Sequence, residues 1–148
     1  MDKDIIFSIN NHSKEFNKYF KILLHNYLSN NELSKAILYG TLNGGKRVRP
    51  FLVSIFSKLA KVPKKNYIRI ASAIECINSY SLIHDDLPSM DNDDFRRGKL
   101  SVHKKFNEAQ AILAGDSLHD IAFELISNKN THSDSNIRIQ LIHELSIA

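Results

Sequence analysis

Apolar residues recur at helical spacing along nearly the whole chain, and this periodicity limits the fold more than any other feature. Between Asp4 and Leu28 they are spaced three and four residues apart, as on one face of an amphipathic helix. No stretch of any length alternates apolar and polar residues as a strand would. The sequence therefore predicts an all-α protein, a bundle of roughly six helices.

The predicted helices are separated by glycine, proline and polar residues. They span residues 4–28, 31–43, 50–60, 65–86, 107–127 and 137–148. The helix over 65–86 is apolar on nearly all sides, which predicts burial by several neighbours. Gly115 lies inside the helix over 107–127, where glycine costs about 1 kcal/mol relative to alanine, so we expect close contact with another helix there.

The length of 148 residues suits one domain, with material for a core. The single cysteine, Cys76, rules out an internal disulfide and fits a reducing compartment. Neither a secretory signal nor a run long enough to span a bilayer is seen, so we expect a cytoplasmic protein without a membrane anchor. The net charge is +4, but the lysines are scattered along the sequence and no recognition motif accompanies them. This argues against nucleic-acid binding.

The stretch SLIHDDLPSMDNDDFRRGK concentrates negative charge, with five aspartates between positions 85 and 94. Two like charges about 4 Å apart repel by roughly 4 kcal/mol at an effective dielectric of about 20, so a cation is expected nearby. Asp85, Asp86 and Asp91 offer oxygen ligands on both sides of a turn at Pro88. Mg²⁺ suits such ligands because it completes its shell with water and phosphate. The alternative is a solvated acidic loop that binds nothing.

An EF-hand calcium loop fits this stretch poorly. Counted from Asp91, Phe95 and Arg96 occupy positions that need an Asp or Asn and a Gly. Calcium binding of that type is therefore not expected.

The stretch GGKRVRP places Lys46, Arg47 and Arg49 between two glycines and the start of a helix. Free N–H groups and the positive end of the helix dipole favour anions there, and three cations suit a diphosphate. It is not a Walker A loop, because the glycine spacing and the Lys-Ser/Thr pair are absent. The alternative is a basic surface loop.

Arg96 and Arg97 directly follow the acidic loop. A ligand phosphate that bridges a metal on the aspartates and these arginines would complete the neutralisation, because arginine binds phosphate through two parallel hydrogen bonds. Surface ion pairs that contribute little to stability are the alternative.

These motifs, together with AILAGDSL, resemble in order and separation the trans-prenyltransferases (polyprenyl synthetases), and among them the bacterial farnesyl diphosphate synthases. The resemblance implies the isoprenoid synthase fold, with a cavity between two aspartate-rich motifs. It also implies a Mg²⁺-dependent reaction that joins isopentenyl diphosphate to an allylic diphosphate, dimethylallyl or geranyl, to give farnesyl diphosphate. Geranylgeranyl diphosphate is the alternative product.

The resemblance assigns roles residue by residue. Asp85 and Asp91 look like the Mg²⁺ ligands, with Asp86 in support, and Arg96 resembles the contact to the allylic diphosphate. The family positions that contact isopentenyl diphosphate resemble those held here by Lys46, Arg49 and Arg97. Asn78 stands where the family usually has a histidine in that site. Asparagine can donate a hydrogen bond but cannot carry the charge of histidine, so weaker isopentenyl binding is expected.

Product length is expected to depend on the two residues about one turn before Asp85, Tyr80 and Ser81. A tyrosine there, with Pro88 and Ser89 lengthening the acidic motif, resembles the farnesyl type. An aromatic core residue with no role in product length is the alternative for Tyr80.

The match would make residues 1–148 the N-terminal half of one isoprenoid synthase domain, which forms a homodimer when full length. A second aspartate-rich motif is then expected beyond Ala148. We therefore expect the chain alone to be incomplete as an enzyme. The alternatives are a catalytically inactive truncated synthase and a non-catalytic partner subunit.

Overall fold

The computed structural model describes residues 3–148 and confirms the all-α prediction. Within them it contains seven helices and one two-stranded hairpin. The helices are α1 Lys3–His25, α2 Glu32–Leu42, α3 Val48–Leu59, α4 Lys64–Asp85, α5 Val102–Lys105, α6 Glu108–Ser127 and α7 Ser135–Ile147, and the strands are β1 Phe95–Arg96 and β2 Lys99–Leu100. The sequence predicted six of these helices to within a few residues and missed the four-residue α5.

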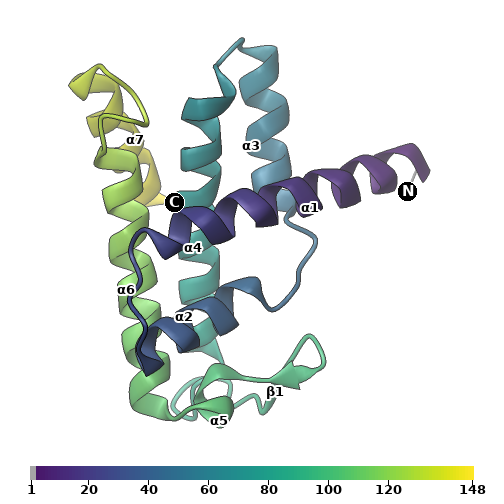
Figure 1. Cartoon of the computed structure of the whole chain (residues 1–148), viewed down its shortest axis with the longest axis vertical. Coiled ribbons are helices and arrows are strands. Elements are labelled where there is room, and N and C mark those ends of the chain that lie inside the picture. Colours follow the sequence, from purple (N-terminus) through teal and green to yellow (C-terminus); the bar gives the residue numbers. More distant parts are fainter. Residues whose placement is uncertain (1–2) are drawn as a thin grey trace.

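Helix α4 lies at the centre of the bundle. It packs most extensively against α6, which runs beside it along the long axis, and then against α3 (Figure 1). Helix α1 crosses over this layer and supplies large buried side chains, Phe16, Phe20 and Leu24. The predicted burial of the fourth helix on several sides is confirmed, because its buried residues include Ala71, Ala73 and Cys76.

Local sequence signals fix where several helices begin. Asn31, Asn107 and Asp134 each accept a hydrogen bond from a backbone N–H two or three residues later, at 2.8 Å. Such N-caps satisfy donors that the first turn leaves unpaired. Local residues of the sequence therefore determine where α2, α6 and α7 begin.

Gly115 allows α4 and α6 to approach closely, as the sequence predicts. A Cβ atom at Gly115 would lie 2.1 Å from Nε2 of His84 on α4. The same His84 nitrogen lies 3.1 Å from the carbonyl oxygen of Ile112 on α6. The ring thus occupies the space that any other residue at position 115 would fill.

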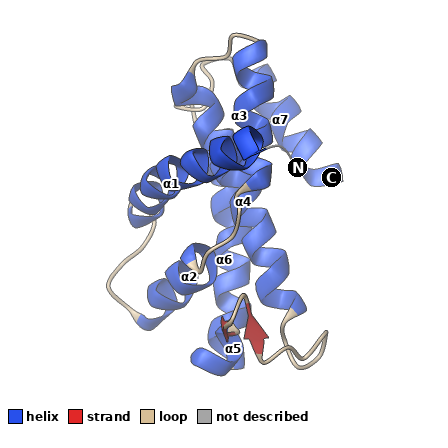
Figure 2. Cartoon of the chain, turned by 90° about the vertical axis from the view of Figure 1, so that its right-hand side faces the viewer, coloured by secondary structure: helices blue, strands red, loops and turns tan. Residues whose placement is uncertain are grey.

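The two ends of α4 differ in charge. Its C-terminal end leads into the acidic loop, the hairpin and α5, and its N-terminal end lies beside the turn from α3 (Figure 2). No helix among residues 3–148 is long and apolar enough to cross a membrane.

Candidate functional site

The acidic loop brings Asp85 and Asp91 together through the main chain. Helix α4 ends at Asp85, and the N–H of Asp91 donates to the carbonyl oxygen of Asp85 at 2.8 Å. Inside the loop, the N–H groups of Met90 and Asn92 both donate to the carbonyl oxygen of Leu87, at 2.9 and 3.1 Å. The turn at Pro88 therefore closes into a hydrogen-bonded loop with an aspartate at each end.

These two aspartates are the carboxylates that the loop leaves unpaired. Among residues 3–148, neither Asp85 nor Asp91 has a cationic group within 4.0 Å, whereas Asp94 pairs with Lys104 at 2.9 Å and Asp93 lies 3.8 Å from Arg96. Two free carboxylates joined by a short loop fit Mg²⁺, which takes one or two carboxylates in such sites. Residues 3–148 contain no group of three or more His, Cys, Asp or Glu side chains that could hold a metal ion. Water and ligand oxygens would have to complete the shell.

Asp86 has a different environment from its neighbour Asp85. It is buried, and both its oxygens accept hydrogen bonds from Nε of Arg96 at 2.8 Å, while Nη2 of Arg96 donates to Oδ1 at 2.6 Å. This hydrogen bonding raises the pKa of Arg96. Asp86 thus anchors Arg96 rather than facing the loop, and Arg96 keeps Nη1 free of these bonds.

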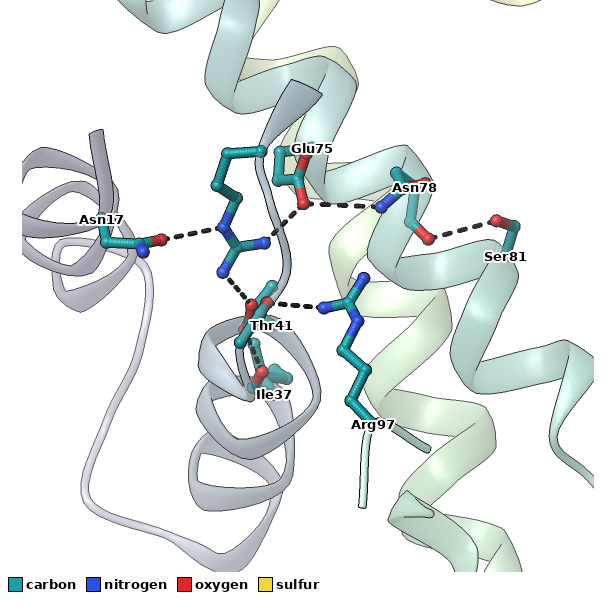
Figure 3. Close-up of polar contacts among 9 residues, drawn as sticks. Asn17, Ile37, Thr41, Glu75, Asn78, Ser81 and Arg97 are labelled. Carbon is teal, nitrogen blue, oxygen red and sulfur yellow. Dashed lines mark hydrogen bonds and ion pairs between the residues drawn. The ribbon is translucent and has the colours of Figure 1, made fainter. Parts of the chain in front are cut away.

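The hairpin carries Arg97 onto the glycine loop. Arg97 and Gly98 form the two-residue turn between β1 and β2, with φ of 54° and 75°, positive as a type I′ turn requires. Nη1 of Arg97 donates to the carbonyl oxygen of Gly44 at 2.5 Å (Figure 3). A Cβ at Gly45, where φ is 110°, would lie 2.6 Å from the same nitrogen. Glycine is needed at position 45 for both reasons.

The position of Arg97 favours the binding of an anion. Its burial, followed by the positive charge of Arg47, lowers the pKa of the Arg97 guanidinium. A guanidinium stays protonated at neutral pH, so an uncompensated positive charge remains beside the GGKRVRP loop. Lys46, which is exposed, follows this glycine pair.

Arg47 was expected to face a diphosphate with Lys46 and Arg49, and for Arg47 this expectation is wrong. Arg47 is buried, and its three nitrogens donate to Oδ1 of Asn17, Oε1 of Glu75 and the carbonyl oxygen of Thr41. It is the N-cap residue of α3, directly before Val48, and has the left-handed conformation with φ of 52°. Because its hydrogen bonds reach α1, α2 and α4, Arg47 fixes the loop and leaves Lys46 and Arg49 exposed on either side.

Asn78 and Arg49 meet in one cavity of about 390 Å³, whose other walls are mainly apolar and include Ile74 and Ile77. Nδ2 of Asn78 lies 3.4 Å from Oε1 of Glu75, the oxygen that also accepts from Arg47 (Figure 3). Glu75 therefore connects the basic loop to position 78.

A second cavity, of about 340 Å³, is lined by Tyr80, Ser81, His84 and Asp85. Ser81 also lines the cavity of Asn78, so it borders both spaces. The Tyr80 ring packs edge-on against His84 and His119, at 4.8 and 5.3 Å between ring centroids. The structure thus brings the two residues expected to affect product length next to Asp85.

Glu75 is the site residue that the sequence prediction missed. It lies on a helix that is apolar on nearly all sides, and a buried carboxylate requires a cationic partner. That mismatch was the signal that could have identified it. The partner, Arg47, could not be chosen among the nearby arginines without the left-handed turn of the loop.

Comparison with known proteins gives consistent results. Residues 30–147 match the family model for polyprenyl synthetases. The farnesyl diphosphate synthase of Escherichia coli (strain K12) is 48% identical over 120 residues, 80% of this chain and 40% of that protein. The chloroplastic geranylgeranyl pyrophosphate synthase of Capsicum annuum is 51% identical over 96 residues, 65% of this chain and 26% of that protein.

A solved structure of an FPP/GFPP synthase from Zymomonas mobilis superposes with a TM-score of 0.88 and 41% identity. The match covers 97% of this chain and 53% of that one. The chain thus spans about half the length, or less, of these relatives. With the match to residues 30–147 and this shared fold, the chain belongs to the polyprenyl synthetase family.

Proposed function

We propose that the chain forms the diphosphate-binding half of a Mg²⁺-dependent prenyltransferase, which condenses isopentenyl diphosphate with dimethylallyl or geranyl diphosphate to give farnesyl diphosphate. The observation that supports this most is the pairing in the acidic loop. Asp85 and Asp91 stay unpaired and are joined by a backbone hydrogen bond, while the neighbouring aspartates are paired or close to cations. These are the oxygens that would hold the metal.

Bound Mg²⁺ would stabilise the negative charge that develops on the departing diphosphate. The residues of this chain would do the rest of the positioning. Arg96, anchored by Asp86, would direct its free nitrogen towards the allylic diphosphate. Lys46, Arg49, Arg97 and Asn78 would hold isopentenyl diphosphate, because they surround the cavity and the loop next to it. Fixed donors of this kind stabilise developing charge without reorganising during the reaction.

The binding step can be tested on the chain itself. Titration calorimetry with inorganic diphosphate should give binding that is strengthened at least tenfold by Mg²⁺. Asp85→Asn should abolish that strengthening, because it removes a charged ligand while retaining the shape of the side chain. Diphosphate binding that is the same with Mg²⁺ and with a chelator would overturn the proposed metal site.

Product length is the second question, since relatives include a geranylgeranyl pyrophosphate synthase. We propose farnesyl diphosphate because an aromatic residue, Tyr80, lines the space beside Asp85. A fusion of this chain to the part of the Escherichia coli relative outside the match can be given geranyl and isopentenyl diphosphates. Farnesyl diphosphate should be the main product, and Tyr80→Ala should shift it towards longer chains. Geranylgeranyl diphosphate from the unmodified fusion would show that Tyr80 sets no limit at that length.

The family resemblance also leads us to propose a homodimer for the active form. Light scattering during size-exclusion chromatography of the same fusion tests this. A monomeric mass for a fusion that catalyses prenyl transfer would exclude the proposed homodimer.

A further inference from the structure

A basic cavity lies at the end of the bundle opposite the acidic loop. It has a volume of about 970 Å³ and is bounded by the α3–α4 turn, the first turns of α4, the α6–α7 loop and one side of α7. Figure 1 shows these segments together at one end of the molecule, away from α5 and the hairpin. Four cationic side chains line it, namely Lys61, Lys65, Arg69 and Lys129.

No negative charge compensates these four cations within the cavity. Its lining contains no Asp or Glu, and among residues 3–148 none of the four has a carboxylate within 4.0 Å. Acidic groups on the neighbouring segments have other partners. Glu15 pairs with Lys64, Glu124 accepts a hydrogen bond from Tyr27, and Asp134 accepts one from the N–H of Asn136. Like charges gathered in one cavity repel, so an anion in the cavity would be stabilised.

Arg69 is held in place by buried groups. Its Nε donates to Oγ1 of Thr131 at 2.9 Å, and Nδ2 of Asn66 donates to the Thr131 carbonyl oxygen at 2.5 Å. Thr131 is fully buried and itself donates to the carbonyl oxygen of Leu125. The guanidinium is therefore oriented before any ligand arrives, which reduces the entropy lost on binding.

The backbone around the cavity adds to its positive potential. Helix α4 begins after Pro63 with no side-chain cap and with no acidic residue in its first turn, which instead carries Lys64 and Lys65. Lysines at this end oppose the helix dipole. Lys61 also has the left-handed conformation, with φ of 57°, where glycine is usual. Two locally unfavourable features, lysines in the first turn of α4 and a lysine in the left-handed conformation, thus place cations beside this cavity.

The cavity also has an apolar wall. Ile70, Ile137 and Leu141 line it opposite the lysines, with Tyr19 at one edge. We propose that this basic cavity is a second anion site that binds an amphiphile, with a phosphate or diphosphate head on the four cations and an apolar chain along this wall. Free prenyl diphosphates and the headgroups of anionic phospholipids share that chemistry.

The test uses the whole chain with Lys46→Gln and Arg49→Gln, without Mg²⁺, so that the loop at the other end no longer contributes. Farnesyl diphosphate and inorganic diphosphate are titrated by calorimetry, and vesicles of phosphatidylglycerol in phosphatidylcholine by co-sedimentation. We expect farnesyl diphosphate to bind at least tenfold more tightly than inorganic diphosphate. Adding Lys65→Gln and Lys129→Gln should weaken its binding at least tenfold, while Ile137→Ser should weaken binding of farnesyl diphosphate only.

The matched control is Lys14→Gln with Lys21→Gln, which removes the same charge from exposed positions of α1 outside the cavity. This control should leave binding unchanged. Binding to vesicles but not to farnesyl diphosphate would identify the headgroup as the source of the phosphate, and the reverse would identify a free diphosphate. The inference fails if no probe binds, or if the control pair weakens binding as much as the cavity pair. Neither result would bear on Asp85 and Asp91.

Discussion

Arg47 and Glu75 form a buried ion pair between the start of α3 and the middle of α4, with side chains only 1% and 4% exposed. Removing one partner of such a pair leaves the other charge buried and uncompensated, which costs about 3–5 kcal/mol. Glu75→Gln should therefore lower the free energy of unfolding by about 3 kcal/mol, measured by urea denaturation. Glu32→Gln is the control, because its ion pair with Lys35 is exposed and should change stability by less than about 0.5 kcal/mol. Equal effects would mean that burial of the pair is unimportant.

The unpaired aspartates Asp85 and Asp91 should differ from the paired Asp94 in their effect on Mg²⁺-dependent diphosphate binding. Asp91→Asn should remove the Mg²⁺-dependent part of diphosphate binding, since it takes away one proposed ligand charge. Asp94→Asn should leave that part unchanged within about a factor of two, because Asp94 pairs with Lys104. Calorimetry at matched ionic strength measures both. Loss of Mg²⁺ dependence in both variants would indicate a general effect of loop charge.

Position 78 offers a test of substrate discrimination. Asn78→His places a ring beside Glu75, whose negative charge favours the protonated imidazole. Affinity for isopentenyl diphosphate should rise several-fold, and that for geranyl diphosphate should stay nearly the same. Competition binding with the two diphosphates gives the comparison, and an equal gain for both would remove Asn78 from the isopentenyl site.

Lys61 carries a conformational cost that can be measured. The N–H of Lys61 donates to the carbonyl oxygen of Lys58, and the N–H of Val62 donates to the carbonyl oxygen of Ser57. These two hydrogen bonds form a Schellman motif, which favours glycine at position 61. Lys61→Gly should stabilise the fold by about 0.5–1 kcal/mol. Lys58→Gly, inside α3, should instead destabilise it by about 1 kcal/mol. The prediction is contradicted if thermal denaturation shows a loss of stability for both.

His12 should make stability depend on pH. Burial, followed by the positive charge of Lys58, lowers its pKa below the ordinary value of 6.5. The unfolded chain therefore takes up a proton first, and stability that is present above about pH 6.5 is lost as the pH falls through the lower folded value. His12→Phe, beside Phe16 and Phe51, should reduce this loss between pH 7 and pH 5, whereas exposed His143→Gln should not. Identical pH profiles for wild type and His12→Phe would refute the assignment.

The sequence predicted the helices well because their signals are local. Apolar spacing, asparagine caps and Pro63 act within a few residues of each boundary. Through the family resemblance it also singled out Asp85 and Asp91 as ligands, with Asp86 in support. It could not show that Asp86 holds Arg96, which a two-residue hairpin brings back to it. That hairpin has too few residues to show strand alternation.

Contacts between distant segments were less predictable. Arg47 was grouped with Lys46 and Arg49 by charge alone, although only a left-handed φ decides which of the three turns inward. The lysines seemed scattered along the sequence, yet folding collects Lys61, Lys65 and Lys129 around one cavity. Charge counted along a chain says little about charge gathered in space.

The hydrogen bond from the N–H of Asp91 to the carbonyl oxygen of Asp85 has a consequence for mutational tolerance. Because this main-chain hydrogen bond holds the backbones of Asp85 and Asp91 together, the exposed side chains of Ser89 and Met90 between them contribute little to that approach. Substitutions at those two positions could accumulate without moving either ligand. The loop can thus vary in its surface chemistry while it keeps the geometry of its two ends.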